Sequence, residues 1–381
     1  PSPPPPGPRP ERYSRGRGAV STPQRRAHPP GARPAQRAPR RAGRAWRAIR
    51  QAGLGLVALL GTSCLPAHAT EIIGAGSSFG APIYGAWGEG VSHAMDIRLN
   101  YQTIGSGAGQ NQVRARTVDF GASDAPMNAD QLAQNGLLQF PTVLGAIVLV
   151  VNLPGVDTAH LHLTGELLAR LYAGDITMWN DPRIVAENPG MTLPAMPVAP
   201  VRRADGSGTT FVFTSYLSCV SPRWAEEEGR GTSIEWPAGE GARGNDGVAA
   251  AVRNTEGSIG YLEYAYAAGN HMPMVELRNR HGDLVAADPE SFSRAVTSAR
   301  WAQDATHSAD VLDGEGAGAW PIMAATYVLV PLDRAATPQG RAVRAFFDWA
   351  MQHGGDAARA LGYVPLPAEI STSMRAVLDT H

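Results

Sequence analysis

The folded part of the chain opens with two copies of one unit, in which a short strand leads through a glycine-rich loop into an amphipathic helix. The first copy places a strand at residues 71–73, a loop at 74–80 and a helix from 81 to about 92. The second copy places an alternating strand at 97–104 and a helix from 105 to about 116. Strands that alternate with helices in this way build a sheet covered by helices. The repeat therefore predicts an α/β fold.

Further strands and helices follow as far as the C-terminus. The apolar run 144–151, bounded by Pro141 and Asn152, is typical of a fully buried strand. The stretch from about 278 to 316 is polar and poorly periodic. The last predicted helix, at 340–352, comes late in the chain and is expected to pack back on the first domain. A chain that crosses twice between domains in this way makes a hinge. The other predicted elements are strands from 118 and at 197–201, 258–264 and 320–330, and helices at 163–172, 244–253 and 340–352.

Two polar residues follow predicted strands at positions where a ligand could bind. Asp124 lies at the C-terminal end of its strand, where open α/β sheets bind ligands, although a turn-capping aspartate has the same local pattern. Ser78 lies near the N-cap of the first helix, and an ordinary helix cap is the alternative. The glycines at 105–109 lack the full spacing and the acidic partner of a dinucleotide fingerprint, so no nucleotide site is predicted.

A basic and glycine-rich stretch at residues 202–210 feeds the apolar positions of another predicted helix. The first amide groups of a helix have no internal partners and lie at the positive end of its dipole, which suits a bound anion. Arg203 adds a planar fork of hydrogen-bond donors. Asp205, two residues later, either orients that guanidinium or is an ordinary loop aspartate.

Charge divides the chain into two unlike parts. Residues 1–50 hold 13 arginines and a single acidic residue, Glu11, whereas the rest holds 20 arginines against 33 acidic residues. The acidic part lacks the basic surface of a nucleic-acid-binding protein. Its net charge of −13 also means that an anion must be held by short-range donors, since long-range attraction is absent.

The N-terminal residues are typical of segments outside the folded protein. Residues 1–50 are rich in Pro, Arg, Ala and Gly and are expected to be disordered. They are either a basic tail or lie upstream of the true translation start, because the chain opens on Pro and its first Met is Met95. Residues 44–69 combine a basic region, a short apolar run and a small-residue cleavage site, which predicts a secretory signal cut after Ala69. Cys64 is a candidate for lipidation, and without it Cys219 is the one remaining cysteine.

The remaining length and composition favour two domains and no catalytic centre. About 310 residues exceed what one hydrophobic core usually serves. The pair His160 and His162 lacks partners at a recognised metal-ligand spacing, so no metal is predicted. Gly206-Ser207-Gly208 is not the full nucleophile motif of hydrolases, and no histidine and aspartate can be assigned as its partners.

Six stretches together resemble the phosphate-binding receptors of bacterial Pst-type ABC transporters. The resemblance runs from about residue 71 to 365 and has the six stretches in the family's order. They are Gly74-Ala-Gly-Ser-Ser-Phe79, Tyr101-Gln-Thr-Ile-Gly-Ser106-Gly, Val118-Asp-Phe-Gly-Ala-Ser-Asp124-Ala-Pro, Gln139-Phe-Pro-Thr-Val143, Val201-Arg-Arg-Ala-Asp-Gly-Ser-Gly-Thr209 and Gly244-Asn-Asp-Gly247.

The resemblance implies a two-lobe periplasmic binding protein of type II, with a hinge and a ligand cleft between the lobes. Lobe 1 is expected at 70–143 and 325–381, and lobe 2 at 144–324. The implied phosphate contacts are Ser78, Phe79, Ser106 and Asp124 from one lobe and Arg203, Ser207, Gly208 and Thr209 from the other, with Asp205 in support. Relatives commonly have Ala-Thr-Phe-Pro where this chain has Ser77-Ser78-Phe79-Gly80, so the hydroxyl is kept and the proline is lost.

The family implies a non-enzymatic periplasmic receptor that binds inorganic phosphate and delivers it to an inner-membrane ABC permease with its ATPase. It is expected to be a monomer without a cofactor. Asp124 explains the preference for phosphate, because a carboxylate repels an anion unless that anion carries a proton to donate. Phosphate keeps a proton near neutral pH and sulfate does not. A receptor for another tetrahedral oxyanion, and a secreted phosphoesterase, remain the alternatives.

Overall fold

The computed structural model describes residues 69–380. The predicted basic extension, the signal segment up to residue 68 and the candidate lipid attachment at Cys64 lie outside the described residues. Ala69, the last residue before the predicted cleavage, directly precedes the first strand.

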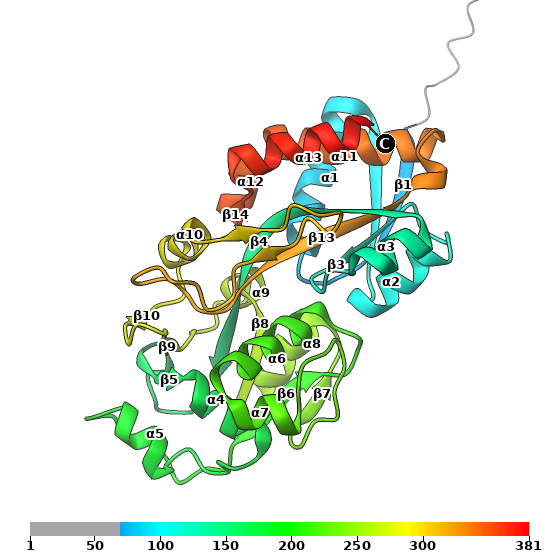
Figure 1. The fold of residues 1–381 in the computed structure, drawn as a ribbon. Helices are drawn as coiled ribbons and strands as arrows, with labels where there is room; N and C mark the ends of the chain where they lie inside the picture. Colours follow the sequence, from blue (N-terminus) through cyan, green and yellow to red (C-terminus); the bar gives the residue numbers. More distant parts are fainter. Residues whose placement is uncertain (1–68, 381) are drawn as a thin grey trace, which may run out of the picture. The chain divides into compact units, whose positions relative to one another are not determined.

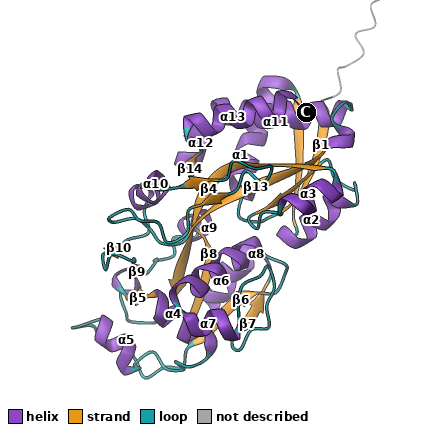
Figure 2. Cartoon of the chain, viewed as in Figure 1, coloured by secondary structure: helices purple, strands orange, loops and turns teal. Residues whose placement is uncertain are grey.

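The fold is built on one mixed sheet, which has nine strands within residues 69–380 (Figures 1 and 2). Eight of them are hydrogen-bonded in the order β2-β1-β3-β13-β4-β8-β6-β7, and β14 pairs with β4. The strands β1, β2 and β3 run parallel, as do β8, β6 and β7, whereas β13 and β4 are antiparallel to their neighbours. The bounds are β1 (Thr70–Gly76), β2 (Ile97–Thr103), β3 (Phe120–Ser123), β4 (Leu137–Val151), β6 (Ala199–Arg203), β7 (Glu240–Ala242), β8 (Ser258–Glu263), β13 (Met323–Pro331) and β14 (Val364–Pro365).

The long buried strand β4 joins two halves of this sheet. Its residues Leu137 to Ala146 pair with β13, and Ile147 to Val151 pair with β8. We call the strands β2, β1, β3, β13 and the first part of β4 the first half-sheet. The second part of β4 with β8, β6 and β7 is the second half-sheet. The predicted boundary between residues 143 and 144 falls inside β4, so the limits of the lobes stay a prediction.

Helices cover both half-sheets and confirm the α/β class. In the first, α1 packs on β2 and α2 packs on β1 and β3, while α11, the helix predicted at 340–352, packs on β1 as expected (Figure 1). In the second, α8 packs on β6 and β8, and α6 lies beside α4 and β8. The bounds are α1 (Ala81–Met95), α2 (Ser106–Arg114), α3 (Ala129–Asn135), α4 (Gly165–Ala173), α5 (Pro182–Glu187), α6 (Gly208–Val220), α7 (Pro222–Glu227), α8 (Gly244–Asn254), α9 (Tyr264–Gly269), α10 (Pro289–Thr297), α11 (Pro338–His353), α12 (Gly355–Ala360) and α13 (Ala368–Thr380).

The remaining elements are short and lie beside the main sheet. They are β5 (His162–Thr164), β9 (Glu276–Arg278) and β10 (Leu284–Val285), which form one small sheet, the pair β11 (Arg300–Trp301) and β12 (Ala309–Asp310), and the 3₁₀ turns η1 (Thr158–His160) and η2 (Leu332–Arg334). No helix within residues 69–380 is long and apolar enough to cross a membrane.

Each half-sheet packs on a cluster of aromatic side chains. In the first, Phe347 of α11 lies 5.1 Å from the ring of Phe120 and 5.5 Å from that of Phe140. In the second, the rings of Phe213 and Tyr261 stack at 4.2 Å. Since α11 brings Phe347 back from the end of the chain, the C-terminal helices complete the first core.

Several details differ from the sequence-based expectations, and two unpredicted helices, α12 and α13, follow the one expected to be the last. The predicted buried strand starts at Leu137 and so passes through Pro141, which pairs with Tyr327 where the register shifts. Such an irregularity tolerates a residue that has no N–H. A helix, α10, lies in the stretch 278–316, where it begins on a capping box formed by Asp288 and Ser291. Finally, the N-cap of α1 is Gly80, so Ser78 does not cap that helix.

Candidate functional site

The first half-sheet presents its polar loops at one edge, because β1, β2 and β3 are parallel and their carboxyl ends meet there. The loop after β1 carries Ser77, Ser78 and Phe79, the first turn of α2 carries Ser106, and β3 ends one residue before Asp124. All five residues are buried. The amide N–H of Asp124 donates to the hydroxyl of Ser106 at 3.3 Å, so two of these loops are tied together.

The second half-sheet supplies the donor-rich part of the site. Strand β6 ends at Arg203, and α6 begins at Gly208 with Ser207 as its N-cap. The hydroxyl of Ser207 accepts from the amide of Thr210 at 3.1 Å, which is an ordinary cap bond. The amides of Gly208 and Thr209 occupy the first two positions of the helix, where no carbonyl of the helix can accept from them.

The two sets of loops meet at glycines. A Cβ atom at Gly208 would lie 2.5 Å from both Asp124 Oδ2 and Ser106 Oγ, so the start of α6 faces the carboxylate directly. A Cβ atom at Gly105 would lie 2.5 Å from Asp205 Oδ2. The amide of Gly107 donates to the carbonyl of Gly206 at 2.9 Å, which joins a loop of the first half-sheet to a loop of the second.

Arg203 is held by a buried ion pair with Asp205. Its Nε donates to Asp205 Oδ1 at 2.8 Å, and its Nη2 donates to Asp205 Oδ2. Although burial alone raises the pKa of Asp205, the hydrogen bond and charge of Arg203 lower it below its usual value. Nη1 of Arg203 also donates to Thr209 Oγ1 at 3.3 Å. The orienting contact predicted for Asp205 is therefore present.

Asp124 is the carboxylate that faces this donor set, and its side chain is almost completely buried. Burial raises the pKa of Asp124 to about 6, although hydrogen bonds from Ser77 and Ser106 and the charge of Arg203 act in the opposite direction. The hydroxyl of Ser77 lies 2.7 Å from Asp124 Oδ1 and 2.6 Å from Oδ2. Sequence reasoning placed the hydroxyl of Ser78 in the site and did not assign a role to Ser77.

Ser78 is hydrogen-bonded to residues of the helices α8 and α9, and Phe79 is hydrogen-bonded to Tyr363, which directly precedes β14. The hydroxyl of Ser78 accepts from the amide of Asn245 at 3.2 Å and from its side-chain nitrogen at 3.1 Å. Tyr266 donates to the carbonyl of Ser78 at 2.7 Å, and Tyr363 donates to the carbonyl of Phe79 at 2.6 Å. The stretch Gly244–Gly247 was part of the family resemblance, but the sequence did not indicate that Asn245 lies against Ser78.

Glu263 is a second buried carboxyl group close to the site, at the end of β8. Its Oε2 accepts from the amide of Ala265 at 2.9 Å, and its Oε1 has no hydrogen-bond partner among the described residues. Burial raises the pKa of Glu263 well above its usual value, because a buried site disfavours the charged form of a carboxyl group. A single acidic residue in the apolar strand 258–264 was the sequence signal for it.

The arrangement combines many donors with one ionisable acceptor. Arg203, the start of α6 and the hydroxyl of Thr209 can donate to an oxyanion, and the ionised carboxylate of Asp124 can only accept. Within residues 69–380, no group of three or more His, Cys, Asp or Glu side chains is placed to hold a metal ion. His160 and His162 instead pair with Asp157 and Glu276 at 2.8 Å and 3.0 Å.

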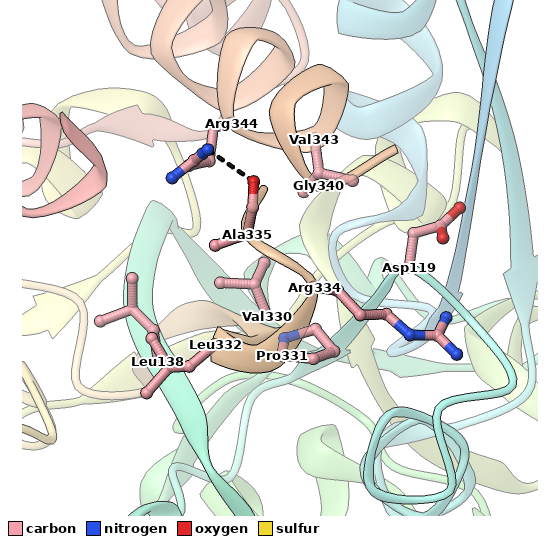
Figure 3. A pocket seen from close by; sticks show the side chains of 10 residues that line it. All are labelled: Asp119, Leu138, Val330, Pro331, Leu332, Arg334, Ala335, Gly340, Val343 and Arg344. Carbon is pink, nitrogen blue, oxygen red and sulfur yellow. Dashed lines mark hydrogen bonds between the residues drawn. The ribbon is translucent and has the colours of Figure 1, made fainter. Parts of the chain in front are cut away.

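Two pockets differ in their relation to this site. A pocket of about 540 Å³, including open solvent at its mouth, has Asp124 in its wall together with residues of α6 and β13, among them Val212 and Ala325. Another, of about 390 Å³, lies between the end of β13 and α11 and is lined mainly by apolar residues such as Leu138 and Val343 (Figure 3). The second pocket contains none of the predicted site residues.

Comparison with known proteins gives consistent matches over most of the chain. Residues 61–353 match the family described as PBP superfamily domain. The chain is 45% identical over 326 residues to the phosphate-binding protein PstS of Pasteurella multocida, covering 86% of this chain and 95% of that protein. It is 42% identical over 306 residues to the PstS of Xylella fastidiosa strain Temecula1, covering 80% of this chain and 84% of that protein.

A solved structure supports the fold. A high affinity periplasmic phosphate-binding protein (PfluDING), bound with phosphate, matches with a TM-score of 0.66 at 21% sequence identity. The match covers 81% of this chain and 93% of that one. The fold is therefore the α/β fold of two-lobe, type II periplasmic binding proteins, as the sequence predicted.

Proposed function

Because the chain belongs to the family of PstS phosphate-binding proteins, within the PBP superfamily, we propose that it is an exported receptor for inorganic phosphate. It binds one phosphate between the two half-sheets and delivers it to an ABC permease with its ATPase. The observation that carries this proposal is the close approach of the buried Asp124 carboxylate to the donor-rich start of α6 at Gly208.

The proposed ligand set draws on both half-sheets. The first contributes Ser78, Phe79, Ser106 and Asp124, and the second contributes Arg203, Ser207, Gly208 and Thr209, with Asp205 orienting the guanidinium. Such a set suits an anion that both accepts from many donors and donates to one carboxylate. The second pKa of a phosphate group is roughly 6, so inorganic phosphate near neutral pH still carries a proton for Asp124. Sulfate carries none.

The same geometry separates this proposal from its alternatives. A receptor for a fully ionised tetrahedral oxyanion gains nothing from Asp124, since a buried carboxylate opposed to a charge is costly. A phosphoesterase requires an activated nucleophile or a metal cluster. Ser207, the serine nearest to the donors, uses its hydroxyl as a helix cap and has no histidine beside it in its hydrogen bonds. We therefore favour a non-enzymatic binding protein.

The same family membership supports our proposals for the export, the cellular location and the lobes of the protein. We propose that residues 44–69 are a signal removed after Ala69 and that the mature protein acts in the periplasm as a monomer. The lobes are proposed at 70–143 with 325–381 and at 144–324, hinged where β4 passes between the half-sheets. Relatives named phosphate-binding proteins support the ligand, and the proposed permease partner rests on the same family membership.

Titration calorimetry of the purified mature chain tests the proposal. Phosphate is expected to bind with a stoichiometry of one, and sulfate at the same pH is expected to bind far more weakly. Equal binding of the two anions would indicate the alternative oxyanion receptor. Binding of neither would reject a receptor of this class.

A further inference from the structure

The hydroxyl group of Ser77 links two groups of the proposed phosphate site. It lies 2.7 and 2.6 Å from the two carboxylate oxygens of Asp124, and it accepts from the amide of Phe79 at 2.9 Å. Ser77 is 1% exposed and Asp124 is 2% exposed, so water does not replace these bonds. Three buried groups are thus joined in one short chain of hydrogen bonds.

The direction of this chain is fixed by its first member. An amide N–H can only donate, so the Ser77 oxygen accepts from Phe79 and the single hydroxyl hydrogen is directed to Asp124. Hydrogen bonds in such a chain polarise one another, and a bond to an ionised acceptor is stronger than a bond to a neutral one. Ser77 therefore stabilises the ionised form of Asp124 more than the protonated form.

We propose that Ser77 is a positioning residue that keeps Asp124 ionised. Because of this hydroxyl, the site rejects anions that have no proton down to a lower pH than it would without it. The inference rests on the proposed phosphate-binding function and adds to it a residue that sets selectivity. A protonated Asp124 can donate, so it no longer excludes sulfate. An ionised Asp124 excludes sulfate and accepts from phosphate.

Within residues 69–380, the charged and titratable groups around Asp124 are one cation, one further buried acid and five tyrosines. Arg203 on β6 is the positive neighbour and stays charged. Glu263 on β8 is a buried acid whose pKa lies well above its usual value because of burial. Burial likewise raises the pKa values of the tyrosines that face Asp124, so all remain neutral; these are Tyr84, Tyr101, Tyr266, Tyr327 and Tyr363.

The sign of the expected change follows directly. Burial raises the pKa of Asp124 to about 6, and the hydrogen bond from Ser77 lowers it. Removing that hydroxyl raises the pKa further, so a larger fraction of Asp124 is protonated at any pH above 5. A hydrogen bond to a charged group corresponds to roughly one pKa unit or somewhat more.

The test measures sulfate and phosphate affinity by calorimetry between pH 4.5 and 8.5 in wild type, Ser77→Ala and Ser123→Ala. In wild type, sulfate binding is expected to appear as the pH falls through about 6. In Ser77→Ala the onset is expected roughly one pH unit higher, with about fivefold tighter sulfate binding at pH 7, because the protonated fraction of Asp124 rises by that factor. Ser123 is an equally buried serine beside Asp124 whose hydroxyl bonds to Ala125 and Gln110, so Ser123→Ala should keep the wild-type onset.

A titration without any ligand provides a second test of the inference. Carbon-13 NMR of the Asp124 carboxyl, with Asp124→Asn to assign the signal, reports its titration without any ligand. The midpoint is expected to be higher in Ser77→Ala, and intermediate in Ser77→Cys, whose thiol is a weaker donor. An unchanged midpoint or an unchanged sulfate onset overturns the role of Ser77. If wild type binds no phosphate, the proposed function fails, whereas the NMR titration still decides whether Ser77 controls Asp124.

Discussion

Replacing Asp124 by asparagine separates the two requirements that the site places on its ligand. The substitution keeps the size of a side chain that is 2% exposed and lies against Gly208. It removes the negative charge and turns one of two acceptor atoms into a donor. The variant is therefore expected to accept sulfate, because the ligand no longer has to supply a proton.

The magnitude follows from what sulfate meets in wild type. At pH 7.5 the carboxylate is ionised, and bound sulfate leaves it unpaired and opposed to a negative charge. Such a buried acceptor costs at least about 1–3 kcal/mol. Removing that cost tightens sulfate binding by about ten- to a hundredfold, since 1.4 kcal/mol is a factor of ten. Phosphate loses a charge-assisted bond but keeps a neutral one, so its affinity should fall only about fivefold to tenfold.

Calorimetry of wild type and Asp124→Asn with both anions at pH 7.5 measures these changes. The ratio of phosphate to sulfate affinity should fall by about two orders of magnitude. Wild-type selectivity in the variant would refute the assignment of Asp124 as the discriminating acceptor. A loss of both anions in a folded variant would also refute it, because it would show that the charge is needed for binding itself.

Stability of the unliganded protein gives an independent check on the same residue. Its folded pKa of about 6 lies above the ordinary value of 3.8, so ionisation of Asp124 destabilises the fold as the pH rises between these values. The full difference is about 3 kcal/mol above pH 6. The free energy of unfolding of Asp124→Asn relative to wild type should therefore increase by up to about 3 kcal/mol from pH 4 to pH 7.5, as measured by urea denaturation.

Three other substitutions test neighbouring parts of the account. Arg203→Lys removes the planar fork that pairs with Asp205 and should weaken phosphate binding at least about tenfold. The control Arg183→Lys, at a surface pair with Asp181, should not weaken it. Equal effects of the two substitutions in calorimetry would contradict the role of Arg203. Gly208→Ala places a Cβ atom against Asp124 and should weaken phosphate binding by more than about tenfold. A Cβ atom at Gly85 contacts nothing within 4 Å, so the control Gly85→Ala should keep wild-type affinity. Tight phosphate binding by Gly208→Ala would refute the close approach of Gly208 to Asp124. Because burial raises the pKa of Glu263, wild type loses stability as the pH rises above 4.5. Glu263→Gln should therefore raise the melting temperature at pH 8 but not at pH 4. The same change in melting temperature at both pH values would show that ionisation of Glu263 is not the cause.

Local patterns in the sequence were sufficient for the fold class and for most elements. The helix that follows Thr164 was predicted from its cap and its apolar spacing, and the structure has α4 beginning at Gly165. The start of β4 was missed because Pro141 suggested a boundary, and the register shift that accommodates it is made by a strand nearly two hundred residues away. Pairing across such a distance leaves no mark in the local pattern.

The site shows the same limit. The ion pair between Arg203 and Asp205 is local, since the partners are two positions apart, and the sequence suggested it. The contact of Ser77 with Asp124 and that of Ser78 with Asn245 join residues 47 and 167 positions apart. Two adjacent serines are equivalent as letters, and only the direction of the loop after β1 decides which hydroxyl faces the carboxylate.

A crystal structure of the mature protein with phosphate would show directly where the anion binds. The account predicts a phosphate between Asp124 and the start of α6, with one oxygen about 2.5–2.7 Å from the Asp124 carboxylate and others facing Arg203 and the amide of Gly208. Phosphate bound in the pocket beside α11, or held by Arg203 with Asp124 turned away from it, would contradict the account.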